Sequence, residues 1–120
     1  MAFKFNMHSE NVLFIKVTGD FTDADTEAYL QELFAYANSF TETEQLHSLL
    51  DATALGKVSP NVRRAVSSSV DDPRFGKTAV LGNNRFVKVL IDFLIKATSR
   101  ENIRYFTDQD AALDWITANQ

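Results

Sequence analysis

Hydrophobic and polar residues alternate at the start of the chain, where Phe3 and Phe5 are separated by polar positions. A period of two is typical of a strand with one buried face. The apolar run 12–17 (VLFIKV) follows after a short turn, so the two segments predict an antiparallel hairpin. We expect Gly19 and Asp20 to end the second strand, because both residues favour turns.

The rest of the chain alternates between segments of helical spacing and short apolar runs. We expect helices at about 23–40, 60–70 and 85–98 and from about 108 onward, and strands at 46–50, 78–82 and 102–106. Strands that alternate with helices imply right-handed crossovers and a mostly parallel sheet. We therefore predict an α/β fold of order β-β-α-β-α-β-α-β-α. It has a mixed, mostly parallel five-stranded sheet with an N-terminal antiparallel hairpin and four helices, and residues 1–120 form a single domain.

Two of the expected helices begin with capping signals. Thr22 is followed three residues later by Asp25, which resembles a capping box with Asp in place of Glu. Ser59 precedes Pro60, and Ser-Pro is a strong helix start with serine as the N-cap and proline at the first helical position. Ser59 therefore has three interpretations: an ordinary cap, a part of a pocket or partner contact, and a phosphorylation site.

The segment 85–98 carries more apolar surface than one core-facing stripe needs. At 100° per residue, apolar side chains cover roughly two thirds of the helix, whereas Lys88, Asp92 and Lys96 share one narrow arc. The excess has to be covered by neighbouring elements, a second subunit, an apolar ligand or a membrane surface. Arg85 and Lys88 form a basic rim beside this face, which suits an amphiphile or a bilayer surface.

Charge is unevenly distributed along the chain, although the net charge is only −4. Residues 1–56 hold two bases against nine acids (−7), residues 57–88 hold seven against two (+5), and residues 89–120 hold three against five (−2). The basic middle segment indicates an anionic partner or ligand.

The residue inventory excludes several kinds of site. The chain has no cysteine, which rules out disulfides, thiolate metal sites and cysteine nucleophiles. Its two histidines lack metal-ligand spacing, and neither a phosphate-binding glycine loop nor a nucleophile elbow is present. No basic patch is interleaved with aromatic residues, so nucleic acid is not expected as a partner. The chain shows no secretion signal or bilayer-spanning segment, and we expect a cytoplasmic protein without a cofactor.

The chain resembles the SpoIIAA-like family, which is related to STAS domains. The resemblance rests on LHSLLDAT (46–53), TAVLGNNRFVKVLIDFLI (78–95) and ENIRYFTDQDAALDWI (101–116), together with the order of the elements. It is to the Sec14-like, lipid-binding branch of small bacterial proteins more than to true anti-sigma factor antagonists. In the antagonists a strand-ending aspartate precedes a D-S-[ST]-G motif whose hydroxyl residue is phosphorylated. Asp51 matches that aspartate and Ser59 falls near the serine, whereas K-V-S-P-N departs from the motif.

The resemblance implies a non-enzymatic binding module for a lipid-like or other small apolar ligand. It also implies a homodimer and a peripheral association with the inner face of a membrane. The alternative that it implies is a regulatory protein-interaction domain of the antagonist type with a degenerate phosphoserine motif. The candidate ligand-binding residues are Asp51, Thr53, Val62, Val66, Asn83, Asn84, Arg85, Phe86, Leu90, Phe93 and Leu94, and the candidate partner or regulatory residues are Ser59, Arg63 and Arg64.

The residues themselves point to one end of the sheet as well. In mostly parallel sheets, ligands bind outside the carboxyl ends of the strands, which are expected here at 51–53 and 82–84. A catalytic interpretation would rest on Asp51, Thr53 and Asn84, and no nucleophile–base pair supports it.

Overall fold

The computed structural model describes residues 2–97 and 101–118 and contains one five-stranded sheet. The strands are β1 (Ala2–Ser9), β2 (Val12–Phe21), β3 (Leu46–Val58), β4 (Phe75–Leu81) and β5 (Ile103–Phe106), and the helices are α1 (Asp23–Ala37), α2 (Pro60–Val70), α3 (Arg85–Ala97) and α4 (Gln109–Thr117). The strand order is β1-β2-β3-β4-β5, with β1 antiparallel to β2 and every other neighbouring pair parallel. The predicted fold class is confirmed.

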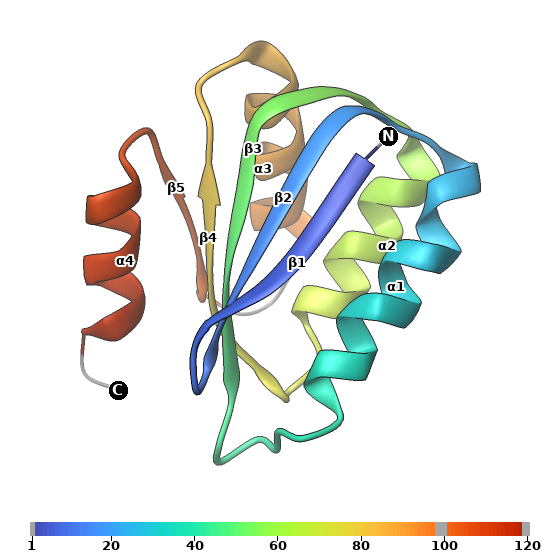
Figure 1. Ribbon diagram of the computed structural model, residues 1–120. Helices are drawn as coiled ribbons and strands as arrows, with labels where there is room; N and C mark the ends of the chain where they lie inside the picture. The colour runs from blue at the N-terminus through green and yellow to red at the C-terminus, as the bar shows by residue number, and fades with distance from the viewer. Residues whose placement is uncertain (1, 98–100, 119–120) are drawn as a thin grey trace.

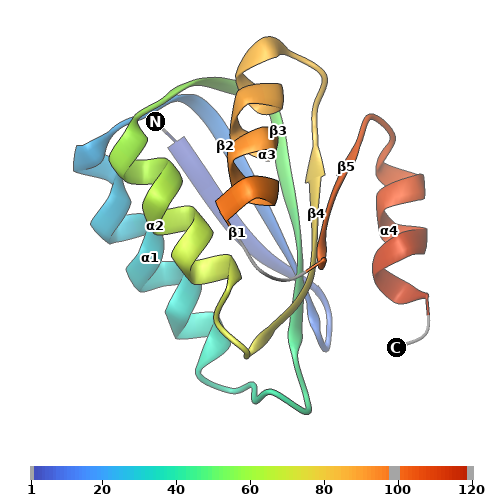
Figure 2. The same ribbon diagram turned by 180° about the vertical axis from the view of Figure 1, so that it is seen from behind.

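The helices are divided unequally between the two faces of the sheet (Figure 1). α1, α2 and α3 lie side by side on one face and form what we call the helical layer, which is turned toward the viewer in Figure 2. α4 lies on the other face, against β3, β4 and β5. The part of that second face formed by β1 and β2 carries exposed polar side chains such as Lys4, Asn6 and Lys16. We call it the open sheet face.

Alternation along the strands sends apolar side chains into two cores, as the period of two requires. The larger core, under the helical layer, contains Leu13, Ile15 and Val17 of β2 with Tyr29, Leu33, Val62, Val66, Leu90 and Leu94 of the helices. The smaller core, under α4, contains Val12, Leu49, Ala79 and Leu81 with Ala112 and Ile116. Each fully buried aliphatic side chain contributes about 1.5–3 kcal/mol relative to an exposed one.

Two strands continue well beyond their expected ends. β2 does not stop at Gly19 and Asp20, and β3 does not stop at Asp51. The two strands keep pairing with each other, from Thr18 opposite Ala54 to the end of both strands, with irregular register on the way. Gly19 has a φ of 80°, which fits the irregularity and which glycine adopts without strain. The predicted ends of β2 and β3 were wrong, because the backbone groups of the two strands continue to hydrogen-bond with each other beyond Gly19 and Asp51.

The remaining boundaries agree with the expected ones to within a few residues. α1 ends at Ala37, three residues before the expected end, and β4 begins at Phe75, three residues early. α2 has the expected bounds of 60 and 70. The expected end of the third helix, Thr98, lies outside the described residues.

Candidate functional site

Ser59 is the N-cap of α2, as its position before Pro60 predicts. Its backbone is extended (φ −67°, ψ 154°), and its Oγ accepts a hydrogen bond of 3.2 Å from the Val62 N–H. This bond satisfies one of the amide groups that the first turn of a helix leaves without an intrahelical partner. The Ser59 hydroxyl also donates a bond of 2.5 Å to Oδ1 of Asp23, the first residue of α1. Ser59 therefore joins the starts of two helices as well as capping one of them.

Asp23 receives a second hydrogen bond, 3.0 Å long, from Nδ2 of Asn61 to its Oδ2 atom. Asn61 in turn accepts a bond from the Arg64 guanidinium through Oδ1. The Ser59 hydroxyl, and after it the Asn61 amide, lower the pKa of Asp23 below 3.8, so its carboxylate is charged at neutral pH. We call Asp23, Ser59, Asn61 and Arg64 the Ser59 network.

A second set of contacts holds the ends of β2 and β3 together beneath this network. Oδ1 of Asp20 accepts a bond of 2.9 Å from the Lys57 N–H, and the Ser59 N–H donates one of 3.1 Å to the Phe21 carbonyl. Gly56 lies so close to Asp20 that an added Cβ would clash with Oδ1. The segments 20–23 and 56–61 therefore form one connected surface, with a shallow hollow lined by Asp20, Asp23, Lys57 and Ser59 among others.

The two predicted arginines of α2 have different surroundings. Arg64 is exposed and belongs to the Ser59 network. Arg63 is half-buried, and its guanidinium carbon lies 5.4 Å from the centroid of the Phe93 ring on α3. Its Nε is buried and has no hydrogen-bond partner among the described residues. Arg63 therefore links α2 to α3 by a cation–π contact.

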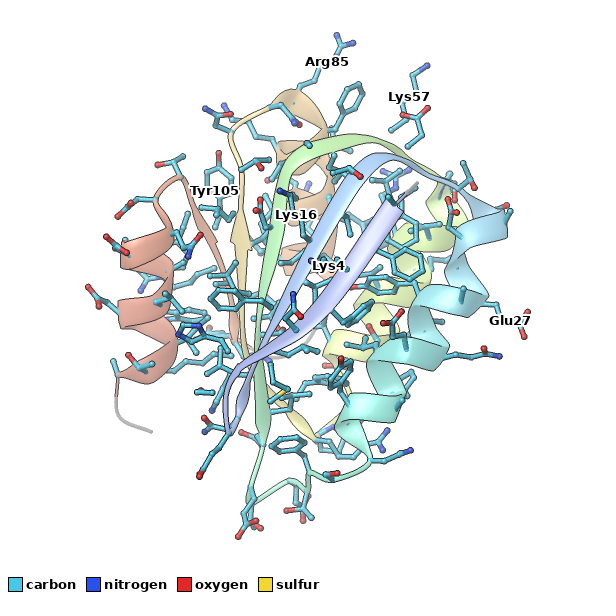
Figure 3. The ribbon with its side chains drawn as sticks, viewed as in Figure 1. Lys4, Lys16, Glu27, Lys57, Arg85 and Tyr105 are labelled. Atoms are coloured by element: carbon cyan, nitrogen blue, oxygen red, sulfur yellow. The ribbon has the colours of Figure 1, made fainter. Side chains whose placement is uncertain are left out.

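The start of α3 is fixed to the end of the sheet by Asn84. Its Oδ1 accepts a bond of 3.0 Å from the Val87 N–H, which caps the helix, and its Nδ2 donates to the Leu55 carbonyl at 3.2 Å. Arg85, the next residue, places its guanidinium carbon 5.0 Å from the Phe86 ring centroid. In Figure 3, Arg85 and Lys57 extend from the same end of the molecule. The basic segment therefore supplies cations at the carboxyl end of the central strands.

The predicted ligand-binding residues do not gather in one place. Val62, Val66, Leu90 and Leu94 are buried in the larger core, whereas Phe86 and Phe93 are half-exposed on α3 and Asn83 is exposed in the loop before it. Asp51 and Thr53 point to the opposite face of the sheet. There Oδ1 of Asp51 accepts bonds from the Thr53 hydroxyl at 2.7 Å and the Thr53 N–H at 3.1 Å. The ligand-binding assignment of all these residues stays a prediction.

The excess apolar surface of α3 is only partly covered. Val87, Leu90, Ile91 and Leu94 are buried, whereas Val89 remains 52% exposed and Ile95 57% exposed. Beneath the helices, a cavity of about 20 Å³ lies among apolar side chains and the hydroxyls of Ser48, Ser69 and Thr78. That volume suits a single water molecule.

Sequence reasoning missed Asp20, Asp23 and Asn61. Within its own segment, Asp23 is one of two acidic residues in the first turn of a helix, where the macrodipole favours a carboxylate. Its contact with Ser59 spans 36 residues, and no local spacing reports such a contact. Within the described ranges, no three metal-ligating side chains come together. None of the described helices has the length and apolar character that crossing a bilayer requires.

Solved structures of other proteins share this fold. An uncharacterised DUF3478-family protein with a SpoIIAA-like fold from Shewanella loihica PV-4 is 21% identical over 96% of this chain and 92% of its own, with a TM-score of 0.72. An anti-sigma factor antagonist from Mycobacterium paratuberculosis is 13% identical over 96% and 94%, with a TM-score of 0.69. The anti-sigma factor antagonist SpoIIAA in its unphosphorylated form is 14% identical over 96% of both chains, with a TM-score of 0.74. At these identities the likeness concerns the fold.

Sequence comparison gives the assignment to a family. No curated protein sequence matches the chain. A family model described as SpoIIAA-like matches residues 12–117, which run from the start of β2 to the end of α4. Because this match covers nearly the whole chain, the protein belongs to the SpoIIAA-like family.

Proposed function

We propose that this chain is a non-enzymatic regulatory domain that binds a partner protein through the starts of α1 and α2. The observation that carries the proposal is the Ser59 network, in which side chains from two helices hold each other at the surface. Two solved structures with the same fold are of anti-sigma factor antagonists, and one of them is described as unphosphorylated. Ser59 lies at a helix start, where a hydroxyl is accessible to a partner.

The bonds of Ser59 indicate how a modification would act there. Both hydrogen-bonding functions of the hydroxyl are engaged, one with Asp23 and one with the Val62 N–H. A phosphate on Oγ would replace the donated proton and add about −1.5 to −2 charges beside the Asp23 carboxylate. The N-terminus of α2 favours an anion at this position, but the charge of Asp23 opposes it. In this proposal, phosphorylation separates Ser59 from Asp23 and changes the surface that the partner contacts.

The proposal is tested by copurification from the cells that produce the protein. We expect a protein kinase or an anti-sigma factor to copurify with the wild-type chain. The double substitution Arg63→Glu and Arg64→Glu removes the Arg64 cation of the Ser59 network and the Arg63 cation that lies on Phe93, so it should abolish recovery. Lys4→Glu, on the open sheet face, makes the same kind of charge change away from the site and should leave recovery intact. Equal recovery of the partner by all three proteins would contradict the proposal, and so would the recovery of neither a protein kinase nor an anti-sigma factor with the wild-type chain.

Binding of a lipid-like or other apolar molecule is the second candidate function. The exposed Val89 and the half-exposed Phe86 and Phe93 on α3 favour it. An acyl chain does not fit in a cavity of about 20 Å³, so it would have to lie on α3 or separate the helices from the sheet. Native mass spectrometry of the purified protein tests this function. A bound mass that is lost on denaturation supports it, and Phe86→Asp should remove that mass while circular dichroism stays unchanged.

A further inference from the structure

β1 is the longer of the two strands that end the sheet. It runs from Ala2 to Ser9 and pairs with β2, whereas β5, at the opposite end of the strand order, has four residues. Within the part of the chain that the structure describes, no strand pairs with the outer edge of β1 (Figure 1). Alternate backbone N–H and C=O groups of such a strand point away from the sheet and can pair with a further strand.

A row of aromatic and apolar side chains follows this edge on the side of the helical layer. Phe3 is half-buried, Phe5 is buried, and Met7, the next residue in the alternation, is 39% exposed. Tyr36 of α1 reaches the same edge, because its ring stacks on Phe5 at 5.9 Å and its hydroxyl donates a long bond of 3.5 Å to the Phe5 carbonyl. Alternate side chains of a strand added beside β1 would lie next to this row, so apolar residues suit those positions.

The opposite side of the same edge is cationic. Lys4 is exposed on the open sheet face, and its cross-strand partner on β2 is Lys16 (Figure 3). Neither lysine forms an ion pair with a described residue. Lys16 has Asp51 of β3 beside it in register, whereas the one strand beside Lys4 places a like charge opposite it. Like charges in this position destabilise a sheet, so an acidic residue on the outer side of Lys4 would be favourable.

We propose that the outer edge of β1 binds an extended segment of a partner protein as a sixth strand, and that this segment alternates apolar and acidic residues. Its apolar side chains lie beside Phe3, Phe5 and Met7, and its acidic side chains lie beside Lys4 on the open sheet face. The alternation is required because successive side chains of a strand point to opposite faces of the sheet. β1 contributes no residue to the Ser59 network, so the inference does not depend on the partner proposed above.

The charges favour this segment over a second copy of β1 and over a uniformly acidic tail. Two copies of β1 that paired along their outer edges would place both Lys4 side chains on the same face of the joined sheet, where they repel each other. Acids on the helical side of an added strand would approach α1, whose charged residues are all carboxylates: Asp23, Asp25, Glu27 and Glu32. Acidic residues are therefore favoured on one face of the added strand, and apolar residues on the other.

A synthetic peptide tests the inference on the full chain. The eight residues of β1 extend over about 27 Å, so the probe is a fluorescein-labelled peptide of similar length in which valine and glutamate alternate. Fluorescence anisotropy should show saturable binding. A peptide of the same composition, with its valines and its glutamates in two blocks, should bind about tenfold more weakly, because it cannot present one kind of side chain to each face.

Two charge reversals locate the binding edge. Lys4→Glu should weaken binding of the alternating peptide roughly fivefold, because an attractive cross-strand pair becomes repulsive. The new glutamate faces Lys16, so the fold itself should not be weakened. Arg104→Glu, at an exposed position on β5, is the matched control and should bind like the wild type. Amide hydrogen exchange in β1 should slow when the peptide is bound, and slowing in β5 instead would overturn the proposal.

N-methylation separates backbone pairing from attraction between side chains. One version of the alternating peptide is methylated at every valine nitrogen and the other at every glutamate nitrogen, so each version blocks one edge of the peptide backbone. One version should bind and the other should not, because one edge of the added strand faces β1. Equal affinity of the two versions overturns the proposal, and so does an alternating peptide that shows no saturable binding up to about 1 mM.

Discussion

The Ser59 hydroxyl donates a 2.5 Å hydrogen bond to Oδ1 of Asp23, across 36 residues of sequence. The same Ser59 Oγ caps α2, and the same Asp23 begins α1. A change at either residue therefore acts on a helix end and on the contact between two helices. Substitutions at Ser59 can affect the cap and the Asp23 contact separately. The cap needs a hydrogen-bond acceptor for the Val62 N–H, whereas the contact needs a donor to the Asp23 carboxylate.

Ser59→Ala should lower the free energy of unfolding by about 0.5–2 kcal/mol, because alanine cannot accept the Val62 N–H. Ser59→Asn is the matched variant, because its side-chain carbonyl can cap α2 and its amide can donate to Asp23. Its free energy of unfolding should therefore stay close to that of the wild type. Ser59→Asp also caps a helix but puts a second carboxylate beside Asp23, so it should be less stable than Ser59→Asn. Urea unfolding at pH 7 measures all three.

The Asp23→Asn change in the Ser59→Asp background completes the test of that repulsion. Asparagine at position 23 can donate to the new carboxylate, so the double variant should be more stable than Ser59→Asp alone. Equal stability of Ser59→Asp and Ser59→Asn would show that the Asp23 contact has no energetic weight.

The contribution of Asp23 should depend on pH in a defined window. Its pKa in the folded chain is lowered below 3.8, first by the Ser59 hydroxyl and then by Asn61. A carboxyl group with a lowered folded pKa stabilises the fold above its unfolded pKa and loses that contribution as the pH falls through the folded value. Wild type should therefore be more stable than Asp23→Asn at neutral pH, and the difference should shrink below pH 3.8.

The comparison is made by urea unfolding of both proteins from neutral pH downward. Other acidic groups titrate equally in both proteins, so the difference between them isolates Asp23. A difference that stayed constant down to the acid transition would mean that the ionisation of Asp23 is not coupled to folding.

The sequence predicted the architecture and the helix starts because both depend on local patterns. The alternation around Phe5 and the Ser59-Pro60 pair report which face is buried and where a helix begins, without reference to distant residues. Thr22 and Asp25 form the expected capping box, since Oδ2 of Asp25 accepts bonds from the Thr22 N–H at 3.0 Å and its hydroxyl at 2.9 Å.

The candidate site was less predictable because it depends on which segments become neighbours. Asp51 was placed with the helix residues because a strand end was expected there. The longer β3 leaves its side chain on the other face of the sheet from Leu90. Asp23 was missed because its contact is with Ser59, which lies 36 residues away at the start of another helix. Side chains alternate between the two faces only within a strand, so Asp51 could be assigned to a face only once β3 was known to continue past it.

His47 should make the fold less stable as the medium becomes acidic. Its Nδ1 accepts a bond of 2.8 Å from the Lys77 N–H, which only an unprotonated nitrogen can do. Burial, and after it the charge of Lys77, lower the pKa of His47 below 6.5, although Glu10 and Glu44 line the same hollow and favour the charged form. The unfolded chain therefore takes up the proton first, and stability should fall as the pH drops below 6.5 toward the folded pKa.

Two measurements check the behaviour of His47. Nuclear magnetic resonance titration of its ring should give a midpoint below 6.5. His47→Asn keeps an acceptor near the Nδ1 position but does not titrate, so it should reduce the fall in stability as the pH drops below 6.5. An unchanged slope in this variant would assign the pH dependence to other groups.

Gly56 should tolerate no side chain while Asp20 is in place. An alanine Cβ at position 56 would clash with Oδ1 of Asp20, and this oxygen accepts the Lys57 N–H. Gly56→Ala must therefore displace the carboxylate and break that bond, and we expect it to cost about 1–3 kcal/mol. Asp20→Ala removes the same bond without the clash. In the Asp20→Ala background, Gly56→Ala should have a much smaller effect, because the nearest remaining atoms are backbone atoms at 3.2 Å. Urea unfolding of the four proteins measures this coupling, and additive effects would contradict a direct clash between the two positions.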